Sequence, residues 1–186
     1  MPKVSNVSVY GFEESIRGAK FPMSVDVDKL NTDLTNGIKG LAQSEHGAGH
    51  DQWLTGVTVQ FDLTFSLKAW PEAQRYHFLD FVSSQSTMHR IAKMDIVNCC
   101  NEYVTKEAID NLEKLKNEYL ADQTTEKYLK LLYNIPTGFE LTARMTTNYR
   151  QLKTIYSQRR NHRLKDWQMF CDWIETLPHS ELITGE

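Results

Sequence analysis

The segment 146–167, TTNYRQLKTIYSQRRNHRLKDW, gathers side chains that could bind an anion. In a helix, successive side chains turn by about 100°, so Arg159 lies only about 20° from the apolar Leu152. Asn148 and Arg163 lie within about 40° of the same direction. A guanidinium on the inward side of a helix needs a phosphate, a carbonyl edge or a carboxylate as its partner, because a buried unpaired charge is costly. The spacing therefore predicts that Arg159 is either a ligand contact or one half of a buried ion pair.

The remaining basic side chains of this segment point elsewhere. Arg150, Lys153 and Arg160 lie about 80–160° from Leu152, so we expect them to form a solvated basic face. Such a face suggests nucleic-acid binding, but the whole chain has 24 acidic and 21 basic side chains and a net charge of −3. A net negative charge argues against a protein that coats DNA or RNA. Nucleic-acid binding is therefore the least favoured alternative.

A glycine-containing loop at 46–51, HGAGHD, offers His46, His50 and Asp51 in close succession. Without a further ligand at helical or hairpin spacing this is a weak metal signal, so no metal site is predicted. We expect instead that the loop lies beside a ligand and that His50 touches it. His77, which lies between two aromatic residues in a predicted helix, is expected to be half-buried and structural.

The three cysteines, Cys99, Cys100 and Cys171, include no C-x-x-C pair. An odd number of thiols without such spacing favours reduced, buried cysteines in the cytoplasm. The sequence also has no apolar run long enough to cross a membrane and no export signal at its start. We therefore expect a cytoplasmic protein without a membrane segment.

Two strands and the helices around them must position these side chains. Residues 57–67 alternate apolar and polar side chains without an error, which predicts a long strand with one buried face. Residues 139–143 alternate in the same way and lead into the basic segment. A weaker strand is predicted at 7–10, residues 84–104 are mixed, and helices are predicted over 12–19, 26–42, 69–84, 105–123, 124–134, 146–167 and 166–177. With no repeat or linker, residues 1–186 are predicted to form one α+β domain.

The spacing N-x-R-x-L-x-x-I-x-x-x-R, formed by Asn148, Arg150, Leu152, Ile155 and Arg159, resembles the C-terminal helix of the flavin-dependent thymidylate synthases, the ThyX family. In that family the last arginine contacts the uracil of dUMP, and the asparagine lies in the flavin site. The resemblance implies that Arg159 is the pyrimidine contact and catalytic residue. It also implies that Arg150 contacts the nucleotide and that Asn148 contacts the flavin or the nucleotide.

A second stretch, QSTMHRIAKMD at 85–95, resembles the family signature Q-x-x-R-H-R-x-x-S-x-N-E-x-S-x-R-Y. Gln85, His89 and Arg90 fall on its Gln, its His and its second Arg, and a histidine, His50, precedes the long strand. The resemblance spans about residues 46–160. It implies that His50 and His89 contact the flavin. Gln85, Arg90 and Lys93 are then expected to contact the nucleotide.

The same signature is matched only in part. Other residues occupy the family's Arg, Ser, Asn, Glu, Ser and Arg positions, namely Met88, Lys93, Asp95, Ile96, Asn98 and Cys100. The resemblance implies a curved, mostly antiparallel sheet flanked by helices, a homotetramer with sites shared between subunits, and FAD as cofactor. The implied activity is a flavin-dependent methylation of a dUMP-type pyrimidine nucleotide. The unmatched positions leave open the alternative of a non-catalytic, phage-type protein that binds or sequesters a nucleotide on the same fold.

Overall fold

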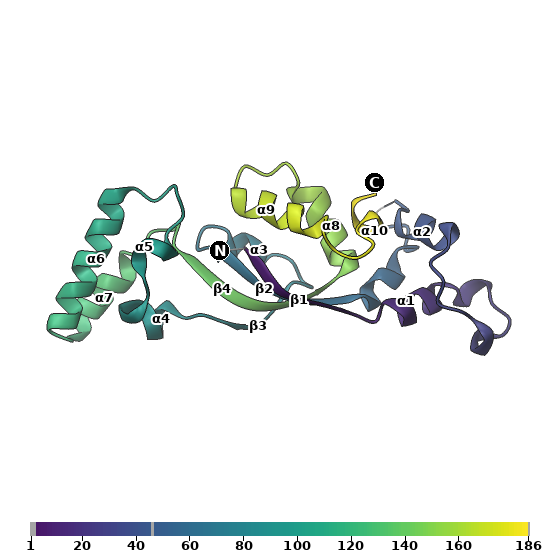
Figure 1. Cartoon of the computed structure of the whole chain (residues 1–186), viewed down its shortest axis with the longest axis horizontal. Coiled ribbons are helices and arrows are strands. Elements are labelled where there is room, and N and C mark those ends of the chain that lie inside the picture. Colours follow the sequence, from purple (N-terminus) through teal and green to yellow (C-terminus); the bar gives the residue numbers. More distant parts are fainter. Residues whose placement is uncertain (1–2, 46, 186) are drawn as a thin grey trace.

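A four-stranded antiparallel sheet is the centre of the computed structural model, which describes residues 3–45 and 47–185. The sheet has the strand order β1-β2-β4-β3, and all neighbouring strands are antiparallel. Helices flank the sheet and extend from both of its ends (Figure 1). The predicted α+β fold with a mostly antiparallel sheet is confirmed. The strands are β1 (Val4–Tyr10), β2 (Thr58–Ser66), β3 (Asp80–Ser84) and β4 (Glu140–Asn148).

The main core lies between one face of the sheet and two helices, α8 (Tyr149–Arg159) and α9 (Lys165–Ile174). Figure 1 shows both helices on the same side of the sheet. The alternating pattern at 57–67 is β2, and its apolar side chains face these helices: Phe61 contacts Phe170, and Phe65 contacts both Phe170 and Trp167. Burying each large apolar side chain contributes roughly 1.5–3 kcal/mol, so this layer fixes α9 against the sheet.

A second, smaller core lies at one end of the sheet, where α6 (Lys106–Ala121) and α7 (Thr125–Tyr133) form a helical hairpin (Figure 1). Leu112 and Leu131 from the hairpin pack there with Phe139, and all three are fully buried. The remaining helices are short. They are α1 (Phe12–Ala19), α2 (Asn36–Ala42), α3 (Trp70–Ala73), α4 (Thr87–Arg90), α5 (Ile96–Cys99) and α10 (Glu181–Thr184), with 3-10 helices η1 (Phe21–Met23), η2 (Val27–Lys29), η3 (Gln52–Gly56) and η4 (Ile91–Lys93).

The helix predicted over 69–84 is wrong. Only Trp70–Ala73 is helical, and residues 80–84 instead form the edge strand β3. All five residues of β3 are exposed, so the strand lacks the alternation of buried and exposed residues that would reveal it. It forms because its backbone pairs with β4, a tertiary contact that local pattern does not encode. His77 lies in the turn before β3 and is exposed rather than half-buried.

The helix predicted over 26–42 is also shorter in the structure. Only residues 36–42 form an α-helix, preceded by the 3-10 helix at 27–29. Thr35 starts α2 because its hydroxyl oxygen accepts a hydrogen bond from Ile38 N at 3.4 Å. Within the described residues, no helix has the length and apolar character needed to cross a bilayer.

Candidate functional site

The junction between β4 and α8 places Asn148. β4 continues five residues past its predicted end at 143, and α8 begins only at Tyr149. Asn148 is therefore the last residue of the strand and the cap of the helix: its Oδ1 accepts a hydrogen bond from Gln151 N at 2.9 Å. Tyr149 N donates to Val57 O at 3.0 Å, which ties the junction to the start of β2.

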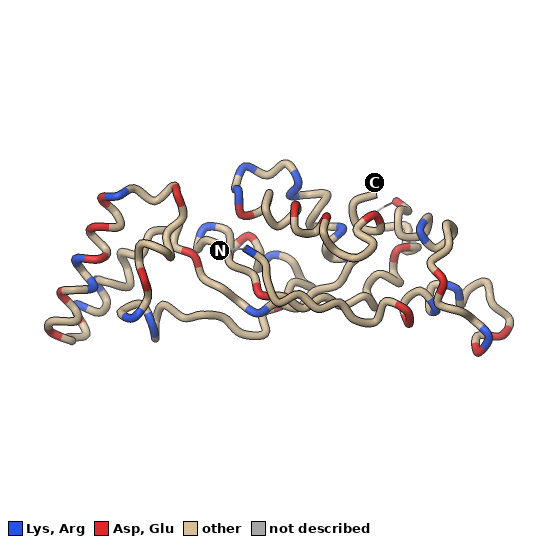
Figure 2. Tube along the Cα trace, in the orientation of Figure 1, with Lys and Arg blue, Asp and Glu red and all other residues tan. Residues whose placement is uncertain are grey.

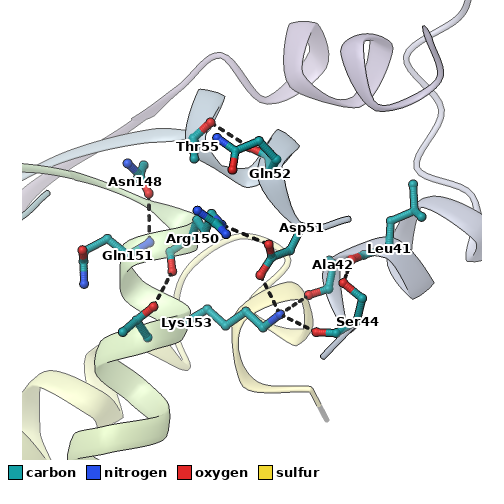
Figure 3. A network of polar contacts seen from close by, with 11 residues as sticks. Leu41, Ala42, Ser44, Asp51, Gln52, Thr55, Asn148, Arg150, Gln151 and Lys153 are labelled. Atoms are coloured by element: carbon teal, nitrogen blue, oxygen red, sulfur yellow. Dashed lines mark hydrogen bonds and ion pairs between the residues drawn. The ribbon is translucent and has the colours of Figure 1, made fainter. Parts of the chain in front are cut away.

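A buried carboxylate fixes the basic side chains next to this junction. Asp51 is fully buried, and its Oδ1 accepts a hydrogen bond from Arg150 Nε at 3.0 Å. Its Oδ2 accepts from Lys153 Nζ at 3.0 Å, and the same ammonium donates to Ala42 O at 2.7 Å and Ser44 O at 3.1 Å (Figure 3). Burial alone would raise the pKa of Asp51, but the hydrogen bonds and charges of Lys153 and Arg150 outweigh it and hold the pKa below its ordinary value.

The prediction that Arg150 and Lys153 form a solvated face is therefore wrong. Helical geometry placed them away from the sheet, but the loop before η3 covers that side of α8 and brings Asp51 against both cations. Arg160 does lie on an exposed surface, in ion pairs with Asp172 and Glu175.

Two neighbouring cavities border this network. One of about 230 Å³ is lined by Asn148, Arg150, Gln151 and Thr154 of the β4–α8 segment together with Thr55. The other, of about 800 Å³, is lined by His50, Gln52 and Trp53 and by residues of α1, and Thr55 borders it as well. Figure 3 shows Thr55 and Gln52 on the element that faces Asn148. We call the two cavities together the Thr55 groove, and their sizes suit small-molecule ligands.

The Thr55 groove brings together three of the predicted site residues, His50, Asn148 and Arg150. His50 is exposed at its edge. His46, the other histidine of this loop, lies outside the described residues. Among residues 3–45 and 47–185, no three His, Cys, Asp or Glu side chains are grouped as a metal site requires.

A second group of predicted site residues lies at the other end of β4. Gln85 follows β3 and bonds to β4 through both its backbone and its side chain: Gln85 N donates to Thr142 O, and its Oε1 accepts from Thr142 N, each at 2.9 Å. His89, Arg90 and Lys93 follow on α4 and η4, are exposed, and form no ion pair within the described part of the chain.

These two groups do not meet within one chain. Thr142, opposite Gln85, lies six residues before Asn148 on β4. At about 3.3 Å per residue, that separation is roughly 20 Å. Figure 1 shows α4 and the start of α8 in different parts of the molecule.

Arg159 lies at the C-terminal end of α8, about 16 Å from Asn148 at about 1.5 Å per helical residue. Its Nη1 pairs with Glu72 Oε2 at 2.8 Å, its Nε donates to the Tyr76 hydroxyl at 2.8 Å, and its guanidinium lies 4.7 Å from the Trp167 ring centre. Trp167 Nε1 donates to the same Glu72 oxygen at 3.0 Å. Of the two predicted roles, the ion pair is the one present within this chain, and the side chain is 13% exposed.

The prediction that Arg163 lies on the inward side of the helix is wrong. α8 ends at Arg159, and Arg163 lies in an exposed loop. Sequence reasoning also missed the partners: it did not single out Glu72 as an ion-pair partner, and it considered Asp51 only as part of a weak metal signal. The sole signal for Asp51 was its position directly after His50.

Comparison with known proteins finds solved structures with the same fold. No protein-family model and no curated protein matches the sequence. The structure of the flavin-dependent thymidylate synthase ThyX from Helicobacter pylori complexed with FAD and dUMP matches with a TM-score of 0.71 at 15% identity, covering 98% of both chains. A second structure of that protein with FAD and dUMP gives a TM-score of 0.74 at 14% identity and the same coverage.

A further match is the UMP/dUMP methylase PolB from Streptomyces cacaoi bound with 5-Br dUMP, with a TM-score of 0.60 at 15% identity, covering 92% of this chain and 89% of that one. At identities this low, the structural likeness establishes the fold alone. The chain therefore has the fold of a class of proteins whose structures hold pyrimidine nucleotides.

Proposed function

We propose that the protein binds a dUMP-type pyrimidine nucleotide together with FAD, in a site completed between copies of the chain, and that it methylates the pyrimidine. The fold carries this proposal. The structures it matches over 98% of the chain hold FAD and dUMP, and the junction bearing Asn148 and Arg150 borders a groove of ligand size. The resemblance in the α8 sequence and the likeness in three dimensions thus support the same function.

The residues of the Thr55 groove fit a flavin. Trp53 lines the groove, and its Nε1 is buried without a hydrogen-bond partner in the described residues. Asn148 uses Oδ1 for the cap, and its Nδ2 forms no hydrogen bond within the same residues. Both donors suit the carbonyl oxygens and ring nitrogens of a flavin, and His50 adds a third polar contact. Reduced FAD would supply the hydride for the pyrimidine, and these residues would hold and orient the flavin.

The nucleotide phosphate is assigned to Arg90 and Lys93. Both are exposed cations without an ion pair in the described residues, and a phosphate dianion would satisfy them. Gln85 is held by β4 through Oε1, which leaves its Nε2 to donate to a pyrimidine carbonyl. His89, next to Arg90, is assigned to the flavin.

Self-association would bring the two groups together. β3 is an edge strand with Phe81 40% exposed and Val82 59% exposed, and an edge of this kind is suited to pairing or packing with another chain. We call Gln85, His89, Arg90 and Lys93 the Arg90 group. A homotetramer in which the Arg90 group of one copy meets the Thr55 groove of another would overcome the roughly 20 Å separation within a chain.

The first test is whether the purified protein binds FAD, measured by absorption and fluorescence titration, and whether dUMP raises its melting temperature. Formation of the methylated nucleotide from dUMP, with reduced FAD and a one-carbon donor, is then followed by mass spectrometry. Absence of flavin binding would refute the flavoenzyme. Absence of any shift with dUMP would refute the nucleotide site as well.

Arg159 provides a sharper test of the site, because its assigned pyrimidine contact requires the guanidinium to exchange Glu72 for the ligand. Loss of such a charge-assisted contact in Arg159→Ala should weaken dUMP binding by about ten- to a hundredfold. Glu72→Gln should leave dUMP binding unchanged or tighter, because it frees Arg159. Arg160→Ala is the matched control, since the adjacent arginine pairs only at the surface. If Arg159→Ala lowers the melting temperature but leaves dUMP affinity unchanged, Arg159 is structural.

A non-catalytic nucleotide-binding protein is the second candidate, and Ile96 is the observation that favours it. Ile96 stands where the resembling signature has an acid, and it is fully buried in the second core. The neighbouring Asp95 is occupied as the cap of α5, because its Oδ1 accepts from Asn98 N at 3.1 Å. Tight dUMP binding without flavin binding or product formation would select this candidate.

A further inference from the structure

A separate cavity of about 490 Å³ lies where the end of β2, the loop before α6 and the loop between α8 and α9 meet. It shares no lining residue with the Thr55 groove. Its volume falls within the range of small-molecule sites, which is about 300–1,000 Å³.

The cavity is preformed, because backbone hydrogen bonds join the segments that line it. Lys68 N donates to Thr137 O at 2.8 Å, and Asn101 N donates to Gly138 O at 3.0 Å. Asn101 Oδ1 accepts from Tyr103 N at 3.1 Å and so fixes the loop before α6. Gly138 packs closely here: a Cβ at this position would lie 2.5 Å from the Val104 side chain. A ligand would therefore meet walls that are already in place.

The lining combines apolar walls with an excess of positive charge. Val104, Pro136 and Leu164 provide apolar surface. Lys68 and Arg163 line the same cavity and form no ion pair within the described residues. Figure 2 shows basic positions in the loop that joins α8 to α9.

Of the other charged groups of the lining, Lys165 has a carboxylate partner, whereas Asp166 has a backbone donor and no ion pair within the described residues. Lys165 bonds to Glu102 at 3.3 Å and lies 5.4 Å from the centre of the Tyr103 ring. Asp166, the one carboxylate in the lining, is 7% exposed, and its Oδ1 accepts a hydrogen bond from Ser66 N at 2.9 Å. Within the lining, Lys68 and Arg163 are therefore opposed only by the single negative charge of Asp166, which leaves an excess of positive charge.

We propose that this cavity is a second ligand site, which takes a small organic anion with an apolar body. The phosphate or carboxylate of the ligand contacts Lys68 and Arg163, and its apolar part packs against Leu164, Pro136 and Val104. Apolar surface supplies part of the affinity. The guanidinium of Arg163 and the ammonium of Lys68 select an anion over a neutral molecule of the same shape. The site is independent of the proposed nucleotide site.

Isothermal titration calorimetry with 1-naphthyl phosphate tests the proposal, with the neutral 1-naphthol and inorganic phosphate as comparison ligands. Wild-type protein should bind 1-naphthyl phosphate more tightly than either comparison ligand. Arg163→Gln and Lys68→Gln should each weaken binding about tenfold, equivalent to about 1.4 kcal/mol. Lys114→Gln is the matched control, because Lys114 is 73% exposed on α6 and lies outside the cavity.

Ala108→Trp places an indole in the cavity from α6 and should abolish binding, while circular dichroism checks that the fold is kept. Equal affinity for 1-naphthol and 1-naphthyl phosphate would overturn the anion preference. Binding that survives Ala108→Trp, or that is unaffected by both cation substitutions, would place the ligand elsewhere. No binding to the wild-type protein at millimolar concentration would also overturn the proposal.

Discussion

Replacing Asp51 by asparagine tests the structural centre of the candidate site. The side chain keeps its shape, but the carboxylate that holds Arg150 and Lys153 is lost. One amide oxygen can still accept a hydrogen bond, whereas the amide NH₂ group faces a second cation and cannot pair with it. The substitution therefore leaves positive charge without compensation beside a fully buried position.

The expected cost follows from the burial of the three partners. Removing one member of a buried ion pair typically costs about 3–5 kcal/mol. Asp51 is completely buried, but Lys153 is 17% exposed and Arg150 is 30% exposed, so water can partly solvate the two cations. We therefore expect a loss at the lower end, about 3 kcal/mol in the free energy of unfolding. For a chain of this size that loss corresponds to a fall in melting temperature of about 6–12 °C.

The pH dependence has a definite sign. The folded pKa of Asp51 is below its ordinary value of 3.8, so its contribution to stability is complete above that value and is lost as the pH falls below it. Asparagine does not titrate. The stability gap between the wild-type protein and Asp51→Asn should therefore be full at pH 7 and should narrow as the pH falls towards 3.

Urea denaturation followed by circular dichroism at pH 7 and at pH 3 measures both effects. Asp172→Asn is the control, because Asp172 is 61% exposed and pairs with Arg160 at the surface, where the expected cost is about 0–0.5 kcal/mol. A loss below about 1 kcal/mol for Asp51→Asn, or a gap that stays constant with pH, would refute the reasoning that a buried carboxylate organises this network.

Three further outcomes are expected. Asn148→Ala should cost about 1 kcal/mol through loss of the α8 cap, whereas Asn148→Asp should keep the cap, and urea denaturation of both variants distinguishes a capping role from none. Val82→Lys places a charge on the exposed edge strand and should dissociate the proposed tetramer in light scattering, so an unchanged mass would show that β3 is not an interface. Burial raises the pKa of the Cys171 thiol to about 12, so iodoacetamide at pH 8 should label it only after unfolding, and labelling of the folded protein would contradict this.

The sequence predicted those elements whose local pattern and tertiary environment agree. β2 was found at nearly its observed bounds because one face is buried, so its side chains alternate in the sequence. β3 was missed because it lies at an edge with both faces exposed, and only pairing with β4 makes it a strand. Asn148 was correctly placed near the start of a helix, but its role as the cap depended on where β4 ends.

The candidate site shows a second limit. The helical repeat correctly separated Arg159 from Arg150 and Lys153, since it depends only on positions within one helix. What packs against each face comes from distant segments: Glu72 pairs with Arg159 across 87 positions, and Asp51 pairs with Arg150 across 99. Charge alone therefore did not reveal which basic side chains were already satisfied.

The residues that remain unsatisfied are the ones that indicate function. Arg150, Lys153 and Arg159 each have a carboxylate partner within the chain, so a ligand must compete with that partner to reach them. Arg90 and Lys93 face no such competition in the described residues, and the Asn148 amide donor and Trp53 Nε1 are free in the same sense. Within the proposed nucleotide site, the phosphate would therefore bind first at Arg90 and Lys93, and the Thr55 groove would supply contacts to the uncharged part of a ligand. β4 keeps these two groups roughly 20 Å apart within one chain, and a second copy of the chain that contributes one of them would bring them closer together.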